Sequence, residues 1–306
     1  MQLPSPGHSG AVNFLRQRLY RAVLKTFTFP SSRLAAGPAI LSLMKRFSSL
    51  LPALLALAAC RSVPYTNRSQ LLLVSADQEA SLGVSSYKQA LSEAKLSGDQ
   101  DAAALVRRVG ERLARAAEKP DYKWEFNLID DPKTVNAWCL PGGKVAVYSG
   151  ILPVTRDENG LAVVMGHEIS HALARHGGER MSQSLIANLG GAALNVALAD
   201  KPAATQQLAA QAYGAGAAVG VLLPFSREQE SEADHIGLIL MAKAGYDPAG
   251  AVGFWERMSQ ATGGGGEGIG KYLATHPPNA ERIRKIRDEL PEAQTYYRKA
   301  GKAQGL

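Results

Sequence analysis

Cysteine is scarce in this sequence, which has only Cys60 and Cys139 among its 306 residues. At most one disulfide can form, so a small scaffold held together by several disulfides is excluded. Cys139 lies in an apolar stretch, and we expect a buried, small hydrophobic side chain there rather than a nucleophile.

Acidic residues are missing from the first 59 positions, which contain seven basic ones: Arg16, Arg18, Arg21, Lys25, Arg33, Lys45 and Arg46. The rest of the chain holds 27 basic and 27 acidic residues, so the formal charge of +7 belongs to the N-terminal segment. That distribution is typical of a targeting sequence and gives no reason to expect a nucleic-acid partner. A hydrophobic content of 46% is ample for a folded core.

The apolar run from 47 to 59 is too short for a stable transmembrane helix. It follows Met44-Lys45-Arg46 and ends in Leu57-Ala58-Ala59-Cys60, which resembles the lipobox of bacterial lipoproteins. The resemblance implies cleavage before Cys60, lipidation of its thiol and attachment to a membrane. Arg61, in place of an aspartate, fits sorting to the outer membrane. If Cys60 is acylated, no intramolecular disulfide remains possible.

We therefore predict a presequence over 1–59, with a lipoprotein signal peptide over 44–59 and Met44 as the true start. A tether over 60–75 and a single domain over 76–306 would follow. A second interpretation makes residues 1–59 a mitochondrial transit peptide, because they contain Arg and Ser and no acid. A third treats Cys60 as an unmodified cysteine.

The periodicity of the mature chain predicts helices over 77–94 and 99–118, followed by extended segments over 124–129, 135–140 and 144–148. The simplest arrangement is a small antiparallel sheet that leads into the next helix. We expect Val145, Ala146 and Val147 to form an edge strand that holds a peptide substrate by strand addition.

The segment from His167 to His171 reads His-Glu-x-x-His. On a helix, residues four apart share one face, so both imidazoles would point at one spot with Glu168 beside it. Two nitrogen ligands and a neighbouring carboxylate are what a catalytic zinc ion needs. Asp157 or Asn159 is expected to cap this helix, and Gly177-Gly178 to end it.

Further helices are expected over 226–244, 247–260 and 280–289. Residues 181–223 are rich in Ala, Leu and Gly, with charge only at Asp200 and Lys201. We interpret this segment as helices packed on the core; a mobile element over the site, or a face that touches the bilayer, is the alternative.

A third zinc ligand is expected from a later helix. A histidine ten residues after His167 would fall at Gly177, so the metzincin pattern fails. Glu230 and Asp234 lie four apart on one helical face, and one could bind metal while the other orients a ligand histidine. Glu232 points elsewhere.

Four stretches, taken together, resemble the HtpX-like gluzincin metallopeptidases, a family that includes the CAAX prenyl proteases: 136–143, 167–171, Ser226 to Asp234, and Thr275-His276-Pro277-Pro278. The resemblance implies an α+β, mainly helical, zincin-like single domain with a small sheet beside the metal helix. It also implies His167, His171 and Glu230 as ligands of one Zn²⁺, with Glu168 as general base. Asp234 would orient a ligand.

His276 is our candidate for a donor to the reacting peptide oxygen, or for a regulatory fourth ligand. For His176 we expect a surface or helix-end position rather than ligation, and the role of His235 stays open. Lack of a clear transmembrane helix favours the periplasmic members of the family, which act on misfolded envelope proteins at the outer membrane. The substrates would be unfolded or misfolded proteins, and outer-membrane assembly machinery is an expected partner.

The competing hypothesis is a zinc-containing, chaperone-like lipoprotein with latent or minor protease activity. Glu168 favours the enzyme, because a purely structural zinc site does not need a general base and usually has four protein ligands.

Overall fold

The computed structural model describes residues 60–218, 223–262, 276 and 280–303, all within one compact unit, Ala56–Leu306. The expected presequence and lipobox residues before Cys60 lie outside the described residues, as do most of 263–279 apart from His276.

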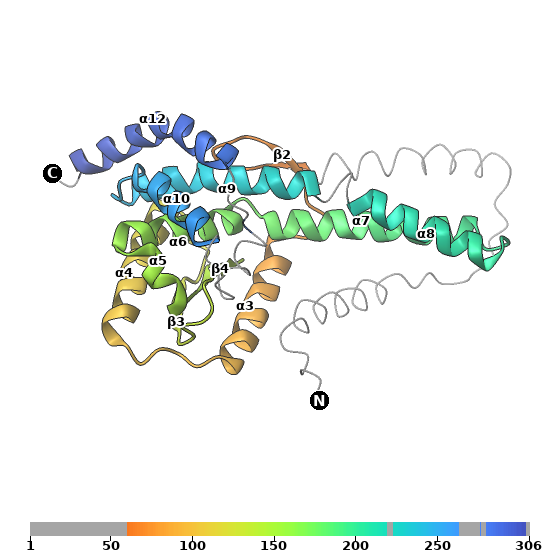
Figure 1. The fold of residues 1–306 in the computed structure, drawn as a ribbon, viewed down its shortest axis with the longest axis horizontal. Helices are drawn as coiled ribbons and strands as arrows, with labels where there is room; N and C mark the ends of the chain where they lie inside the picture. The colour runs from red at the N-terminus through yellow and green to blue at the C-terminus, as the bar shows by residue number, and fades with distance from the viewer. Residues whose placement is uncertain (1–59, 219–222, 263–275, 277–279, 304–306) are drawn as a thin grey trace. The chain divides into compact units, whose positions relative to one another are not determined.

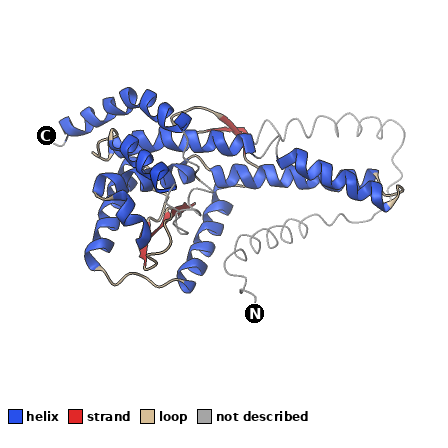
Figure 2. Ribbon diagram, viewed as in Figure 1, coloured by secondary structure: helices blue, strands red, loops and turns tan. Residues whose placement is uncertain are grey.

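The described chain is mainly helical with two small sheets, as the α+β prediction required (Figures 1 and 2). Its elements are, in order, β1 (Cys60–Ser62), β2 (Ser69–Leu71), α3 (Ala76–Glu93), α4 (Gln100–Ala117), β3 (Glu125–Ile129), β4 (Ala137–Leu140), β5 (Lys144–Tyr148), the 3₁₀ turn η1 (Ser149–Ile151), α5 (Leu152–Thr155), α6 (Glu158–Leu173), α7 (His176–Ala197), α8 (Ala203–Ala217), α9 (Leu223–Lys243), α10 (Gly250–Thr262) and α12 (Ala280–Ala303).

The three-stranded sheet has the order β3-β5-β4. β5 pairs parallel with β3 and antiparallel with β4, so the sheet is mixed and the expected all-antiparallel arrangement is wrong. β4 turns back into β5 through Gly142 and Gly143, whose φ values of +88° and +81° suit only glycine. The returning strand takes the central place beside β3, a choice that strand periodicity does not encode.

This order also corrects the expected substrate-binding strand. Val145, Ala146 and Val147 lie in the central strand, with 0% of their surface exposed. Their backbones pair with strands on both sides, so they cannot accept an added strand. Within the described sheet, the edge that contacts α6 is β4.

α6 lies at the centre of the core and is buried on every side. Each residue from Gly160 to Leu173 is buried, as expected for a helix without a polar face. It contacts α4, α9, α10 and β4, and large side chains such as Met165, Ile169 and Trp255 fill the spaces between these elements. A motif placed on this helix is therefore held rigidly and away from bulk water.

α6 and α9 approach each other closely where two glycines meet. A Cβ atom on Gly237 would lie 3.1 Å from the backbone nitrogen of His167, and one on Gly166 would lie 3.3 Å from the carbonyl oxygen of Gly237. The contact brings the middle of α9, which carries Glu230 and Asp234, beside the two histidines of α6.

The start of α6 agrees with the prediction, and its end does not. Asp157 caps its start, accepting a hydrogen bond from the Gly160 N–H at 2.7 Å. Gly177 and Gly178 do not end it, because they lie inside α7. The break comes earlier, at Arg175, whose left-handed backbone (φ 58°) separates the two helices.

Part of the predicted tether over 60–75 is folded onto the rest of the domain. β1 and β2 pair as a hairpin, and Val63 is buried against Ala174 and Ile236. The side chain of Gln70 donates a 2.8 Å hydrogen bond to the carbonyl of Ala174, and the backbone N–H of Leu73 donates one to Ser182. The hairpin is thus part of the folded body.

The 181–223 segment is helical over α7 and α8, which pack against each other through a 2.9 Å hydrogen bond from the Tyr213 hydroxyl to the Ala187 carbonyl (Figure 1). Large apolar side chains on this pair are exposed: Ile186, Leu189, Val196 and Leu208. Among the described helices, none combines the length and the hydropathy needed to cross a bilayer. At the C-terminal side, α12 is longer than the predicted 280–289 helix and packs against α9.

Candidate metal centre

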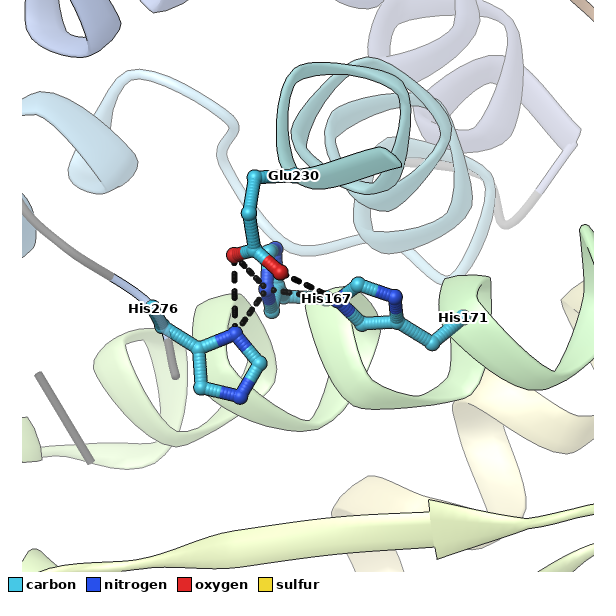
Figure 3. Close-up of side chains that lie close together, drawn as sticks. All are labelled: His167, His171, Glu230 and His276. Atoms are coloured by element: carbon cyan, nitrogen blue, oxygen red, sulfur yellow. Dashed lines mark hydrogen bonds and ion pairs between the residues drawn. The ribbon is translucent and has the colours of Figure 1, made fainter. Parts of the chain in front are cut away.

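Four side chains from distant parts of the chain converge beside α6 (Figure 3). His167 and His171 project from successive turns of α6, Glu230 reaches down from α9, and His276 lies to the left of them in this view. One ligand atom from each lies within 4.8 Å of all the others. The structure therefore brings together the three expected zinc ligands and His276.

The spacing of these atoms fits a zinc ion. Zinc bonds of about 2.0–2.1 Å in a tetrahedron place neighbouring ligand atoms about 3.3 Å apart. The Nε2 atoms of His167 and His171 are 3.1 Å apart. Nε2 of His167 lies 3.3 Å from Oε2 of Glu230, and Nε2 of His171 lies 3.3 Å from Oε1. Two imidazole nitrogens and one carboxylate oxygen are also a donor set that catalytic zinc sites use.

His276 completes the cluster. Its Nδ1 atom lies 3.1 Å from Nε2 of His167 and 2.8 Å from Oε2 of Glu230. Its Nε2 atom is 3.6 Å from the carboxylate of Glu168. The same imidazole thus faces both the ligand atoms and the expected general base.

His167 is oriented by a carboxylate, as expected for a metal-binding histidine. Its Nδ1 atom is 2.9 Å from Asp234, which also accepts hydrogen bonds of 2.6 and 2.8 Å from Arg282. The guanidinium of Arg282 lies 3.5 Å above the ring of Trp255, so it too is fixed. With Nδ1 facing Asp234, the lone pair of Nε2 points to the ligand cluster.

His171 is supported differently, through a second histidine. Its Nδ1 atom lies 2.8 Å from Nδ1 of His176, whose Nε2 atom is 2.9 Å from Glu232. His176 is the first residue of α7 and is fully buried, so a helix-end position is confirmed and a surface position is not.

The charges of the ligand cluster stabilise one another. Burial alone would lower the pKa of His167, but its hydrogen bonds to Asp234 and Glu230 outweigh burial and raise the pKa to about 9. Burial opposes ionisation of Glu230, yet hydrogen bonds with the three clustered histidines hold the pKa of its carboxyl well below its usual range. Burial lowers the pKa of His171, which favours the neutral form that binds metal.

Glu168, the expected general base, is buried, with only 4% of its surface exposed. Burial raises the pKa of the nearby Cys139 thiol on β4, and the charge of Glu168 adds to that effect. The thiol therefore stays protonated, which supports a packing role for Cys139 and not a nucleophilic one. The arrangement also places β4 beside the expected general base.

Three buried residues near the cluster could not be assigned their present roles from the sequence: His176, Glu232 and Arg282. Glu232 does point away from the ligands, as expected, but toward His176. The five-residue spacing between His171 and His176 crosses the break at Arg175, so helical periodicity could not link them. His235 lies 3.6 Å from Glu289 and 3.7 Å from Glu292, and these contacts place it with α12.

Comparison with known proteins agrees with this geometry. The model of peptidase family M48 matches residues 100–290, which include every residue of the ligand cluster. A mitochondrial metalloendopeptidase OMA1 from Schizosaccharomyces pombe is 42% identical over 235 residues, covering 76% of this chain and 67% of the relative.

Two bacterial proteins are similar to this chain at lower identity. The beta-barrel assembly-enhancing protease of Yersinia pestis is 29% identical, with 88% of this chain and 54% of the relative covered. The metalloprotease YcaL of Escherichia coli is 28% identical, with 64% and 76% covered. With its ligand cluster inside the matched region, the chain belongs to peptidase family M48 and is a zinc metallopeptidase.

Proposed function

We propose that this protein is a zinc-dependent endopeptidase in which His167, His171 and Glu230 hold the metal and Glu168 is the general base. The observation that carries the proposal is the convergence of the three side chains: the two imidazole nitrogens are 3.1 Å apart, and each lies 3.3 Å from an oxygen of the Glu230 carboxylate, which suits one bound ion. His167 and His171 lie on the buried helix α6, which holds the distance between their imidazoles fixed.

A zinc ion bound there would supply a water molecule with a pKa of about 7 and would polarise the peptide carbonyl. Glu168 accepts the proton of that water and passes it to the leaving amine. Asp234 keeps the Nε2 lone pair of His167 turned to the metal.

An extended peptide would pair with β4. This edge strand contacts α6, which carries Glu168. The charge of the Glu168 carboxylate raises the pKa of the Cys139 thiol on β4, so the two side chains are near each other. A strand added at this edge would be held by backbone hydrogen bonds, which recognise unfolded polypeptide of almost any sequence.

His276 fits a regulatory fourth ligand better than an oxyanion donor. Its Nδ1 atom already lies at ligand spacing from His167 and Glu230. In that position it would fill the coordination site that a catalytic zinc must keep open, and the protein would be latent until His276 moves. This observation is also what favours the alternative, a chaperone-like protein with minor hydrolysis.

The substrates that we propose are unfolded or misfolded envelope proteins, in the periplasm, with Cys60 lipidated and anchored to the outer membrane. The lipobox-like segment before Cys60 supports this localisation, and outer-membrane assembly machinery is the partner that fits it. The mitochondrial alternative has support in relatives such as the fission yeast protease. Labelling with radioactive palmitate during expression in a Gram-negative host, beside Cys60→Ala, separates the two: label on the wild type alone supports the lipoprotein, and no label on either refutes it.

The activity test is cleavage of casein by the zinc-loaded chain beside Glu168→Gln. We expect the variant to bind zinc and to lose about 10²- to 10⁴-fold in rate. Equal cleavage by both proteins would refute Glu168 as the base. Absence of cleavage by either, with zinc bound, would leave a latent protease or the chaperone-like alternative, and cleavage by zinc-loaded His276→Ala would then support the latent protease.

A further inference from the structure

A buried chain of polar contacts runs away from the ligand cluster, behind His171. His171 contacts His176, and His176 contacts Glu232. All three side chains are buried; His176 has 0% of its surface exposed. Neither His176 nor Glu232 belongs to the ligand cluster or to the reacting groups proposed above.

Only one arrangement of protons suits this chain of contacts when His171 binds metal. Metal binding through Nε2 of His171 requires the proton to sit on its Nδ1 atom. That N–H donates to Nδ1 of His176, 2.8 Å away, which must then carry a lone pair. His176 accordingly carries its own proton on Nε2 and donates it to Glu232, 2.9 Å away. Each contact has one donor and one acceptor.

Glu232 is itself held from the other side by the turn of the β1–β2 hairpin. The hydroxyl of Thr66 donates to one of its oxygens, and Nε of Arg68 donates to the other at 2.9 Å. Arg68 also forms two hydrogen bonds, of 2.7 and 2.8 Å, with Glu179 of α7. The hairpin begins at Cys60 and is far from the metal helix in sequence.

The two histidine ligands are therefore supported by different parts of the chain. His167 contacts its carboxylate, Asp234, directly. His171 reaches Glu232 only through His176, and the hairpin fixes Glu232. Removal of the hairpin would leave every proposed ligand in the chain but would release one support of His171.

We propose that His176 and Glu232 are positioning residues for the metal ligand His171, and that Thr66 and Arg68 of the β1–β2 hairpin hold this pair in place. The inference rests on the proposed role of His171 as a zinc ligand. The inference goes further, because the β1–β2 hairpin would then influence the affinity for metal although the hairpin supplies no ligand.

The first test compares two substitutions of His176. His176→Phe keeps the ring but removes the acceptor, whereas His176→Asn places an amide oxygen where Nδ1 lies and can accept from His171. We expect His176→Phe to bind zinc about 10- to 100-fold more weakly, as partners of metal-binding histidines commonly do when lost. His176→Asn should recover most of that affinity. Zinc affinity is measured by competition with a chromogenic chelator on folded protein, as verified by circular dichroism.

The second test uses a matched pair of buried glutamates. Glu232→Leu and Glu79→Leu each remove a carboxylate that pairs with an arginine, Arg68 and Arg175 respectively. Only Glu232 connects to a ligand histidine. We expect Glu232→Leu to weaken zinc binding at least tenfold and Glu79→Leu to change it less than about threefold. The visible absorption of the Co²⁺-substituted protein should change for Glu232→Leu alone.

The outcomes separate this inference from the proposed ligand set. If His171→Ala keeps wild-type zinc affinity, the ligand set is wrong. If His171→Ala loses zinc while folded His176→Phe keeps full affinity and an unchanged Co²⁺ spectrum, the ligand set stands and the positioning role is refuted. Equal effects of Glu232→Leu and Glu79→Leu, or no difference between His176→Phe and His176→Asn, would also refute it.

Discussion

The Nδ1 atom of His167 lies 2.9 Å from Oδ1 of Asp234, which follows it by 67 residues on another helix. Arg282, from α12, binds the same carboxylate through two nitrogens. Three elements therefore meet at one imidazole, and its orientation depends on all of them. The contact explains why the sequence places an acid four residues after Glu230.

The first prediction is that Asp234→Asn weakens zinc binding about 10- to 100-fold. The new amide can donate to Nδ1 of His167, which moves the imidazole proton to Nε2 and blocks the metal. Competition with a chelator measures the change. Asp99→Asn is the control, because it makes the same charge change at the start of α4 and asparagine caps a helix as well as aspartate. An unchanged zinc affinity of Asp234→Asn would contradict the orienting role.

The second prediction concerns His276. We expect His276→Ala to lower zinc affinity and to raise casein cleavage per zinc-loaded chain severalfold, because removal of a fourth ligand opens a coordination position. Zinc affinity and the rate at saturating substrate are both measured. A lower rate with unchanged zinc affinity would indicate an oxyanion donor instead, and no change in either would exclude both roles.

The third prediction tests β4 as the substrate strand. Tyr148 donates a 3.0 Å backbone hydrogen bond to the carbonyl of Asn136, so in the alternating antiparallel ladder Cys139 directs its N–H away from β5. Proline is tolerated at such an outward position of an edge strand. We expect Cys139→Pro to lower kcat/KM about tenfold, the effect of one lost hydrogen bond of about 1.4 kcal/mol, without unfolding the protein.

Its control is Cys139→Ala, which removes the thiol but keeps the backbone donor. Thermal unfolding of both variants shows whether the sheet is intact. If Cys139→Ala and Cys139→Pro cleave casein equally well, substrate does not pair with β4 at this position.

The fourth prediction is a pH dependence at the start of α6. A hydrogen bond with Arg108 outweighs burial and lowers the pKa of Glu158 below its usual 4.5, and the Tyr246 hydroxyl and Arg112 add to this effect. Since the folded-state pKa is the lower one, these contacts stabilise the fold fully above about pH 4.5 and less as the pH falls below it. Glu158→Gln should cost about 1 kcal/mol at neutral pH, and that cost should shrink in acid.

Urea unfolding of the metal-free protein at several pH values measures this difference. Metal-free protein is used because acid also releases zinc. Glu111→Gln, on the exposed surface of α4, makes the same charge change and should show a much smaller difference. A cost for Glu158→Gln that stays constant with pH would contradict a lowered pKa of Glu158 in the folded protein.

The sequence predicted the parts of the fold that follow local rules. The helices over 77–94 and 99–118 and the strand over 144–148 appear within one or two residues of their expected bounds. The spacing of His167 and His171, and of Glu230 and Asp234, follows directly from helical periodicity. Those two spacings, with the family resemblance, placed the ligand cluster.

Features that depend on tertiary contact were not predicted. The order of strands in the sheet follows from where the β4–β5 hairpin returns, so the substrate strand was assigned to the buried strand β5. The position of His176 depends on the left-handed backbone of Arg175, which separates α6 from α7, and the periodicity of the sequence does not predict that conformation. The hairpin over 60–71 looked like a tether because its strands are only three residues long and its packing depends on distant partners.

The close contact between Gly166 and Gly237 also has a consequence for the choice of metal. Because a side chain at either glycine would press on the backbone of the other helix, the two helices can approach this closely only with glycine at both positions, and this approach sets the place of Glu230 above the histidines (Figure 3). A cage of this size suits a small ion bound by few nitrogen and oxygen atoms. Calcium, with six to eight oxygen ligands at about 2.3–2.6 Å, would need a wider and more flexible one. Gly166 and Gly237, which contribute no ligand, thus help to favour zinc over calcium.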